Sequence, residues 1–223
     1  MTRTRRDVLR ASGVALTGGI AGCLGAGDGD GMDNGEDADD DDDAGPTTTD
    51  VEALPTPTLG PDDAPVTVAV YTDYACPHCQ RYTAETLPRI REEYVSDGVV
   101  RYEHHDFPIP VDDRWSWQVA SAARGVQDSG GDAAFFEFTS AIYPHLESYS
   151  LDVIRSTAEA VGADPESIET AAAEELYRPV VQADREAAAD RGVERTPTIL
   201  VDGEPTSHYE LWAVRGAIES ARP

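Results

Sequence analysis

The sequence predicts an α/β fold built on one central sheet, with a block of helices inserted between the second and third predicted strands. The first observation is the run Val66–Tyr71, whose β-branched and apolar residues are typical of a buried strand. The second is the order of the elements: strand, helix, strand, several helices, strand, strand and helix. The third is length, because about 160 residues from Ala64 onward suffice for one domain with a sizeable core.

The elements outside the helical block follow from local patterns. A helix is expected from about Cys76 to Tyr94, with a kink at Pro88, because proline removes a backbone hydrogen bond inside a helix. The apolar and β-branched residues of 99–107 predict the next strand. The segment 198–203 predicts a strand that ends in an Asp-Gly turn. A short strand at 206–208 and a final helix over 209–221 complete the chain.

The helical block is expected over about residues 112–191. Segments 116–126, 133–146 and 151–161 have helical patterns, and Asp164 followed by Pro165 is typical of a helix start. Pro179 is expected to break or kink the helical segment that follows it. A last helix should run to about residue 190, where Gly192 stops it.

The N-terminal residues 1–23 have the layout of an export signal. Arg5 and Arg6 form a twin-arginine pair, which favours the Tat export route. The apolar stretch 11–21 is too short to span a membrane, which takes roughly 20 apolar residues. Small residues precede Cys23, as they precede the lipidated cysteine of a lipoprotein. We expect Cys23 to anchor the protein to the outer face of the cell membrane; the alternatives are a basic cytosolic helix or a thiol in a discarded peptide.

Residues 24–64 predict a disordered acidic tether, rich in Gly, Asp, Thr and Pro, because they offer little to bury. The whole chain has a formal net charge of −26 and contains no Lys. The predicted domain, residues 65–223, is also acidic. Such a surface keeps a protein soluble and monomeric and predicts a halophilic source, although an ordinary protein with an acidic tail is the alternative. The charge argues against nucleic-acid binding, because phosphates would be repelled.

The motif that carries chemistry is Cys-Pro-His-Cys at 76–79. The chain has three cysteines, and Cys23 belongs to the expected anchor, so Cys76 and Cys79 are left to cycle as a pair. Two intervening residues let one thiolate sit at a helix N-terminus, where unpaired N–H groups stabilise negative charge. The spacing therefore predicts a redox disulfide. A static disulfide and a zinc site are the alternatives; zinc needs about four ligands, and the candidates nearby are His78, His104 and His105.

With these motifs the chain resembles the DsbA-like branch of the thioredoxin superfamily. The resemblance implies a thioredoxin fold with an inserted helical subdomain. It implies that Cys76 is the exposed nucleophile, that Cys79 is the resolving thiol and that the Thr196–Pro197 bond is cis and lies against the site. It covers about residues 65–221 and rests on the segment 71–79, Pro88, the segment 192–198 and the Asp202-Gly203 turn.

The resemblance favours a protein-disulfide oxidoreductase that donates disulfides. Its Pro77-His78 dipeptide is that of DsbA, and a cationic His78 would lower the pKa of Cys76 and stabilise the dithiol, which makes the disulfide a stronger oxidant. Asp73 is a candidate relay for the proton of Cys79; a solvent-facing acid or a helix cap are the alternatives. We expect no cofactor and no metal, exported proteins with thiols or disulfides as substrates, and a membrane redox partner.

Other functions stay open at this point. A thiol reductase or isomerase would use the same cysteines, and the reduction potential would distinguish it. A metal- or peptide-binding thioredoxin-like lipoprotein would use Cys76, His78 and Cys79 without exchange. The tandem histidines His104 and His105, and the tryptophans that begin the helical block, Trp115 and Trp117, are expected to pack in the core.

Overall fold

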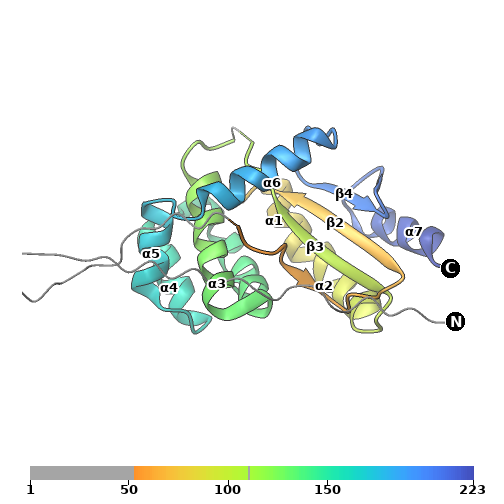
Figure 1. Ribbon diagram of the computed structural model, residues 1–223, viewed down its shortest axis with the longest axis horizontal. Coiled ribbons are helices and arrows are strands. Elements are labelled where there is room, and N and C mark those ends of the chain that lie inside the picture. The colour runs from red at the N-terminus through yellow and green to blue at the C-terminus, as the bar shows by residue number, and fades with distance from the viewer. Residues whose placement is uncertain (1–52, 110) are drawn as a thin grey trace, which may run out of the picture. The chain divides into compact units, whose positions relative to one another are not determined.

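The computed structural model describes residues 53–109 and 111–223. The export signal, Cys23 and most of the predicted tether lie outside the described residues. The described part contains a five-stranded sheet with the order β1-β3-β2-β4-β5 (Figure 1). β2 and β3 are parallel, and the other neighbouring pairs are antiparallel. The strands are β1 (Thr58–Leu59), β2 (Val66–Thr72), β3 (Val100–Asp106), β4 (Thr198–Val201) and β5 (Glu204–Pro205).

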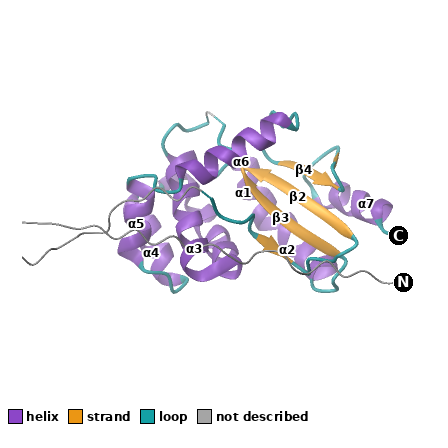
Figure 2. Ribbon diagram, in the orientation of Figure 1, coloured by secondary structure: helices purple, strands orange, loops and turns teal. Residues whose placement is uncertain are grey.

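Helices cover both faces of this sheet (Figure 2). The side chains of Val66, Val68 and Val70 lie in the main core with the helix of residues 77–95 and with α7 (Leu211–Ala221). Their neighbours Ala69 and Tyr71 lie in a second core cluster with α6 (Arg178–Asp190). Because successive residues of a strand face opposite sides, β2 is apolar on both sides, as the sequence predicts for a buried strand.

The helix predicted from about 76 to 94 is present and changes its winding along its length. It consists of α1 (Pro77–Arg81), the π-helical segment η1 (Tyr82–Thr86), α2 (Leu87–Ile90) and the π-helical segment η2 (Arg91–Val95). Pro88 lies in the first turn of α2. Proline has no N–H to continue the α-helical ladder, and the wider winding of η1 precedes it. The irregularity that Pro88 predicts therefore falls at the expected place.

The block between β3 and β4 is helical, as predicted. It contains α3 (Trp115–Ile142), the 3₁₀ segment η3 (Tyr143–Ser148), α4 (Leu151–Ala160), α5 (Pro165–Ala173) and α6. α3 is interrupted at Gly131, whose φ of 75° is not helical, so the sequence shows two separate helical patterns. The prediction for Pro179 was wrong: α6 continues unbroken after it, because Pro179 lies in the first turn of that helix, where the missing N–H costs nothing.

The folded part begins before residue 64, contrary to the predicted end of the tether. Thr58 lies opposite Glu103 in the β1–β3 pair, and its N–H and hydroxyl donate to the Asp132 carboxylate at 2.9 and 3.1 Å. The carbonyl of Pro55 accepts a hydrogen bond from Gln127 at 3.0 Å. The order of this segment comes from hydrogen bonds to distant residues, which its polar composition does not reveal.

The C-terminal elements differ from the prediction in detail. The short strand β5 lies at Glu204–Pro205, two residues before the predicted place. α7 begins at Leu211, two residues after the predicted start, and Trp212 is 63% exposed. Val214 and Ile218 are the residues of this helix that reach the core. None of the helices in the described part of the chain is long and apolar enough to cross a membrane.

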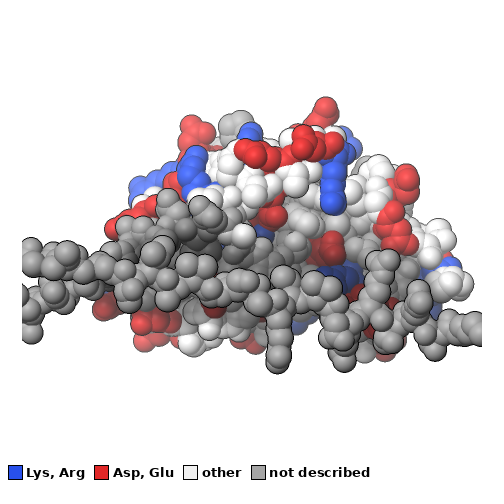
Figure 3. Space-filling model, viewed as in Figure 1, with Lys and Arg blue, Asp and Glu red and all other residues white. Residues whose placement is uncertain are grey.

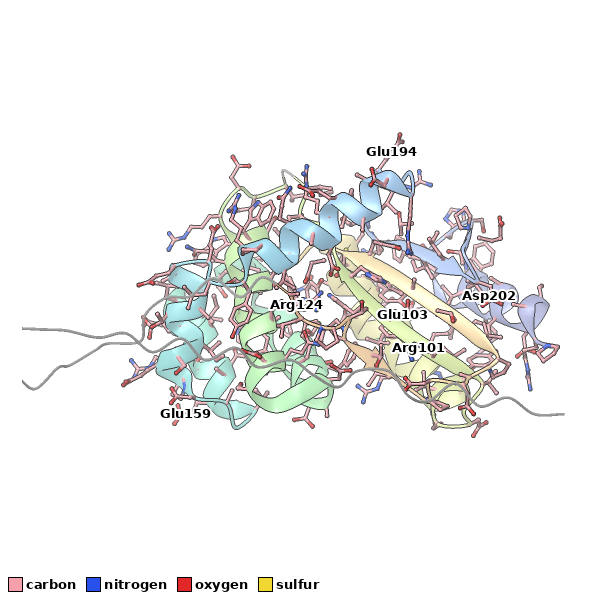
Figure 4. All side chains as sticks on the ribbon, viewed as in Figure 1. Arg101, Glu103, Arg124, Glu159, Glu194 and Asp202 are labelled. Atoms are coloured by element: carbon pink, nitrogen blue, oxygen red, sulfur yellow. The ribbon has the colours of Figure 1, made fainter. Side chains whose placement is uncertain are left out.

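A buried arginine joins the helical block to the sheet. Arg124 of α3 is 1% exposed on its side chain and lies between α3, α6 and the strands (Figure 4). It donates to Asp106 of β3 at 2.6 Å and to Asp184 of α6. Elsewhere Asp and Glu side chains are spread over the visible face with arginines between them (Figure 3). Arg124 is therefore a structural charge, unlike the solvated arginines of the surface.

Candidate redox site

Cys76 stands at the start of α1, directly after the loop that follows β2. It is the N-cap residue, with φ −89° and ψ 118°, and its carbonyl accepts hydrogen bonds from the N–H groups of Cys79 and Gln80 at 3.0 and 3.1 Å. Pro77 fills the first turn, where a proline is favoured. Both cysteines are thiols in this structure. The sequence therefore brings Cys76 to a helix N-terminus, as predicted.

The prediction that Cys76 is exposed was wrong. Cys76 is 4% exposed and Cys79 is 0% exposed. The segment around Thr196 lies against Cys76, whose thiol donates to the Thr196 carbonyl at 3.5 Å. The order of accessibility is as expected, with Cys79 the deeper thiol.

The Thr196–Pro197 peptide bond is cis, as the resemblance implies. This segment lies against the cysteines although 120 residues separate Cys76 from Thr196 in sequence. The Thr196 hydroxyl is buried and has no hydrogen-bond partner among the described residues. It is therefore free to donate to a sulfur that becomes charged.

The pKa values of the two thiols are shifted in opposite directions. The pKa of Cys76 is lowered from 9.0 to about 5, chiefly by a hydrogen bond from the Cys79 thiol, with help from the Thr196 hydroxyl and the backbone N–H groups of Cys79 and His78. Burial raises the pKa of Cys79 well above its usual value, and the neighbouring Cys76 adds to that rise. The first proton to leave the pair therefore comes from Cys76, and Cys79 keeps its own.

Asp73 is buried on the inner side of the motif, and only 1% of its surface is exposed. One carboxylate oxygen accepts from the Ser116 hydroxyl and the Ala75 N–H, both at 2.7 Å, and the other accepts from the Ile109 N–H at 2.8 Å. Burial raises its pKa to about 6, against the effect of these hydrogen bonds. The alternative of a solvent-facing acid was wrong. The group titrates near neutral pH, which suits a proton relay.

His78 is exposed, in contrast to the buried Asp73. Its Nδ1 atom is 2.9 Å from the hydroxyl of Tyr209, which precedes α7. Both residues line a cleft of about 300 Å³ together with the segment 195–199 and the segment 205–208. The cis bond lines the cleft, and the Thr196 carbonyl is 3.5 Å from the Cys76 sulfur.

The remaining sequence candidates lie outside the site. His104 is buried against Phe135, with 4.9 Å between ring centroids, and His105 stacks on Tyr71 at 4.8 Å. Trp115 and Trp117 are partly buried against the main core. Their packing is as expected. Within residues 53–109 and 111–223, no group of three or more His, Cys, Asp or Glu side chains is arranged to hold a metal ion.

Sequence reasoning missed two side chains of the site. Ser116 reaches Asp73 across 43 residues of sequence, and Tyr209 reaches His78 across 131. Neither belongs to a motif, and no local pattern indicates either contact. Both become visible only when the helical block and the C-terminal segment are folded onto the motif.

A family model described as thioredoxin matches residues 52–220, which is most of the chain. The chain belongs to the thioredoxin family. Disulfide bond formation protein D of Bacillus subtilis is 25% identical over 162 residues, with 69% of this chain and 70% of that protein covered. The Na⁺/H⁺ antiporter NhaA 3 of Salinispora tropica is 28% identical over 163 residues, but the chain spans only 24% of that protein's length.

Solved structures share the fold of this thioredoxin-family chain. Oxidised BdbD from Bacillus subtilis superposes with a TM-score of 0.69 at 22% identity, over 74% of this chain and 92% of that one. At this identity the likeness concerns the fold alone. The predicted thioredoxin fold with an inserted helical subdomain is confirmed.

Proposed function

We propose that this thioredoxin-family protein is a protein-disulfide oxidoreductase that oxidises the dithiols of exported proteins. The observation that carries the proposal is the contrast between two adjacent thiols, one with a pKa lowered to about 5 and one with a pKa raised well above the usual value. Disulfide exchange requires this contrast in pKa. The sulfur that bonds to the substrate must be a good leaving group, and the other must stay protonated until it is needed as the resolving nucleophile. The similarity to disulfide bond formation protein D supports the same reaction.

The exchange begins with the Cys76–Cys79 disulfide. A substrate thiolate attacks the Cys76 sulfur, the bond between the two protein sulfurs breaks, and its electron pair leaves on Cys79. A second substrate thiolate then attacks the substrate sulfur of the mixed disulfide, and Cys76 leaves as a thiolate. The substrate loses two electrons and the protein gains them. Because its pKa is about 5, Cys76 is a good leaving group in this second step.

Asp73 supplies the proton in this scheme. Cys79 leaves the disulfide as a thiolate, but its raised pKa means that it soon takes a proton. Asp73 has a pKa of about 6, and its backbone N–H is directed at the Cys79 sulfur. In the reverse direction the same carboxylate accepts the proton and makes Cys79 nucleophilic.

The acidity of Cys76 favours the oxidising direction. At pH 7, which is two units above a pKa of about 5, ionisation stabilises the Cys76 thiol by about 2.7 kcal/mol. A thiol with a pKa of 9.0 is protonated at this pH and gains nothing. This stabilises the dithiol relative to the disulfide and corresponds to about 60 mV for a two-electron couple. A reductase needs the opposite bias.

The cellular setting belongs to the same proposal. The export signal and Cys23 would place the domain outside the cytoplasm on a lipid anchor, as a monomer. A membrane redox partner would then reoxidise the cysteine pair. The strongly acidic composition supports function in high salt.

Disulfide exchange with a reduced, unfolded substrate protein tests the proposal. The oxidised protein should transfer its disulfide, Cys76→Ser should abolish transfer, and Cys79→Ser should accumulate a mixed disulfide when supplied with an oxidised substrate. Stoichiometric binding of copper or zinc by the reduced protein, without exchange, would replace the proposal with a metal-binding role.

A further inference from the structure

The Tyr209 side chain contacts the imidazole of His78, the histidine of the redox motif. The Nδ1 atom of His78 is 2.9 Å from the Tyr209 hydroxyl, and the two ring centroids are 5.6 Å apart at 53°. A tyrosine hydroxyl donates to a neutral imidazole nitrogen and accepts from a protonated one, so the contact survives a change of protonation. Within the described part of the chain, His78 makes no other side-chain hydrogen bond.

The backbone on both sides of Tyr209 is held by structured neighbours, a hydrogen-bonded turn before it and the start of α7 after it. The Thr206 N–H donates to the Ile199 carbonyl at 2.9 Å, and the Thr206 hydroxyl donates to the His208 carbonyl at 2.8 Å. Directly after Tyr209, Glu210 is the N-cap residue of α7. The Tyr209 ring also packs against the main core. The hydroxyl is therefore presented to His78 from a rigid support.

The pair forms one wall of the cleft beside the nucleophile. The cleft is also lined by the cis segment, whose Thr196 carbonyl is 3.5 Å from the Cys76 sulfur. The other ionisable side chains in the lining are Arg195 and His208, and none of the lining residues is acidic. The nearby carboxylate of Glu210 lies 3.7 Å from His208. Cys76 precedes His78 by two residues, so its thiolate is the anion that the motif itself supplies to an imidazolium at His78.

We propose that Tyr209 is a positioning residue for disulfide exchange, whose hydroxyl holds the His78 imidazole in one orientation within the redox motif. A cation near a thiolate stabilises it. Without the hydroxyl, the exposed ring is free to turn into solvent, and this stabilisation weakens. The inference rests on the proposed function of the cysteine pair and deepens it by adding a residue outside the motif.

The test is the titration of the Cys76 thiolate, followed by its ultraviolet absorbance in the reduced full chain. Tyr209→Phe removes a single oxygen. It should raise the pKa of Cys76 by about 0.5 unit, a threefold loss in the thiolate equilibrium, and should make the reduction potential more negative. In a His78→Phe background the same change should have no effect, because the two residues act as a unit. Tyr94→Phe is the matched control, since the Tyr94 hydroxyl donates to Glu219 at 2.8 Å outside the site.

An unchanged pKa of Cys76 in Tyr209→Phe would overturn the inference, as would an equal rise in the His78→Phe background. If Tyr209→Phe does not fold, nitrogen NMR of His78 in the unaltered protein decides. A single fixed tautomer in the neutral form is expected, and the tautomer mixture of a free imidazole overturns the inference. The titration needs no substrate, so absent disulfide transfer by the unaltered protein would count against the proposed function alone.

Discussion

Acidification should remove the stability advantage of the reduced protein over the oxidised one. The reduced form holds a Cys76 thiolate that the disulfide form lacks. Its pKa is depressed from 9.0 to about 5, so its stabilising contribution is fully present above pH 9.0 and is lost as the pH falls through about 5. The perturbation is therefore a change from about pH 8 to about pH 5 at constant salt.

The size of the effect follows from the two pKa values. The thiolate stabilises the folded dithiol by about 4 kcal/mol at pH 8, by about 2.7 kcal/mol at pH 7 and by about 0.4 kcal/mol at pH 5. Asp73 also titrates in this range, since its pKa is about 6. It is present in both redox forms, so its contribution largely cancels in the difference between them.

The assay is denaturant unfolding of the reduced and oxidised forms in parallel across this pH range. The free energy of unfolding of the reduced form, relative to the oxidised form, should fall by about 3 to 4 kcal/mol on acidification. Cys79→Ala is an informative control, because the Cys79 thiol is the largest cause of the low pKa of Cys76. In that variant Cys76 should titrate at a higher pH. A difference between the redox forms that stays constant over the whole range would refute the reasoning.

Two substitutions test the surroundings of the site. Asp73→Asn should slow the resolution of the mixed disulfide roughly tenfold to a hundredfold near neutral pH and remove an inflection near pH 6, because the proposed relay group is lost; rate measurements across pH check this. Arg124→Met should lower the free energy of unfolding by about 3 to 5 kcal/mol, because Asp106 is left as an unpaired buried charge; denaturant unfolding measures it.

A specific result would contradict each of these two predictions. An inflection near pH 6 that survives in Asp73→Asn would assign the proton to another group. Arg124→Lys keeps the charge of Arg124 but not its forked geometry, so its loss of stability should be smaller. Equal losses in Arg124→Met and Arg124→Lys would show that the charge of the arginine contributes little.

The core of the site could be predicted from sequence because its signals are local. A cysteine followed by proline after a buried strand specifies a helix N-terminus, and this suffices to place Cys76. The Thr-Pro pair before a second strand indicated the cis segment through family resemblance. Pro88 marked an irregularity in its helix, since proline has a backbone preference of its own.

What the sequence could not predict depends on contacts between distant segments. Thr58 belongs to the sheet only because β3 and Asp132 lie beside it. Cys76 is buried in the main core, and the cis segment, 120 residues away in sequence, contacts its thiol. Ser116 and Tyr209 are ordinary residues of a helix and a loop until the fold brings them to Asp73 and His78. Local patterns specify the elements and the motif, whereas the acidities of the site come from tertiary packing.

The reduction potential of the Cys76–Cys79 pair, measured against glutathione in high salt, tests the central claim most directly. The low pKa of Cys76 predicts an oxidising couple, more positive than thioredoxin and shifted towards the value of about −120 mV for DsbA. A value near or below that of thioredoxin, about −270 mV, would contradict an oxidase and indicate a reductase that draws electrons from a membrane donor.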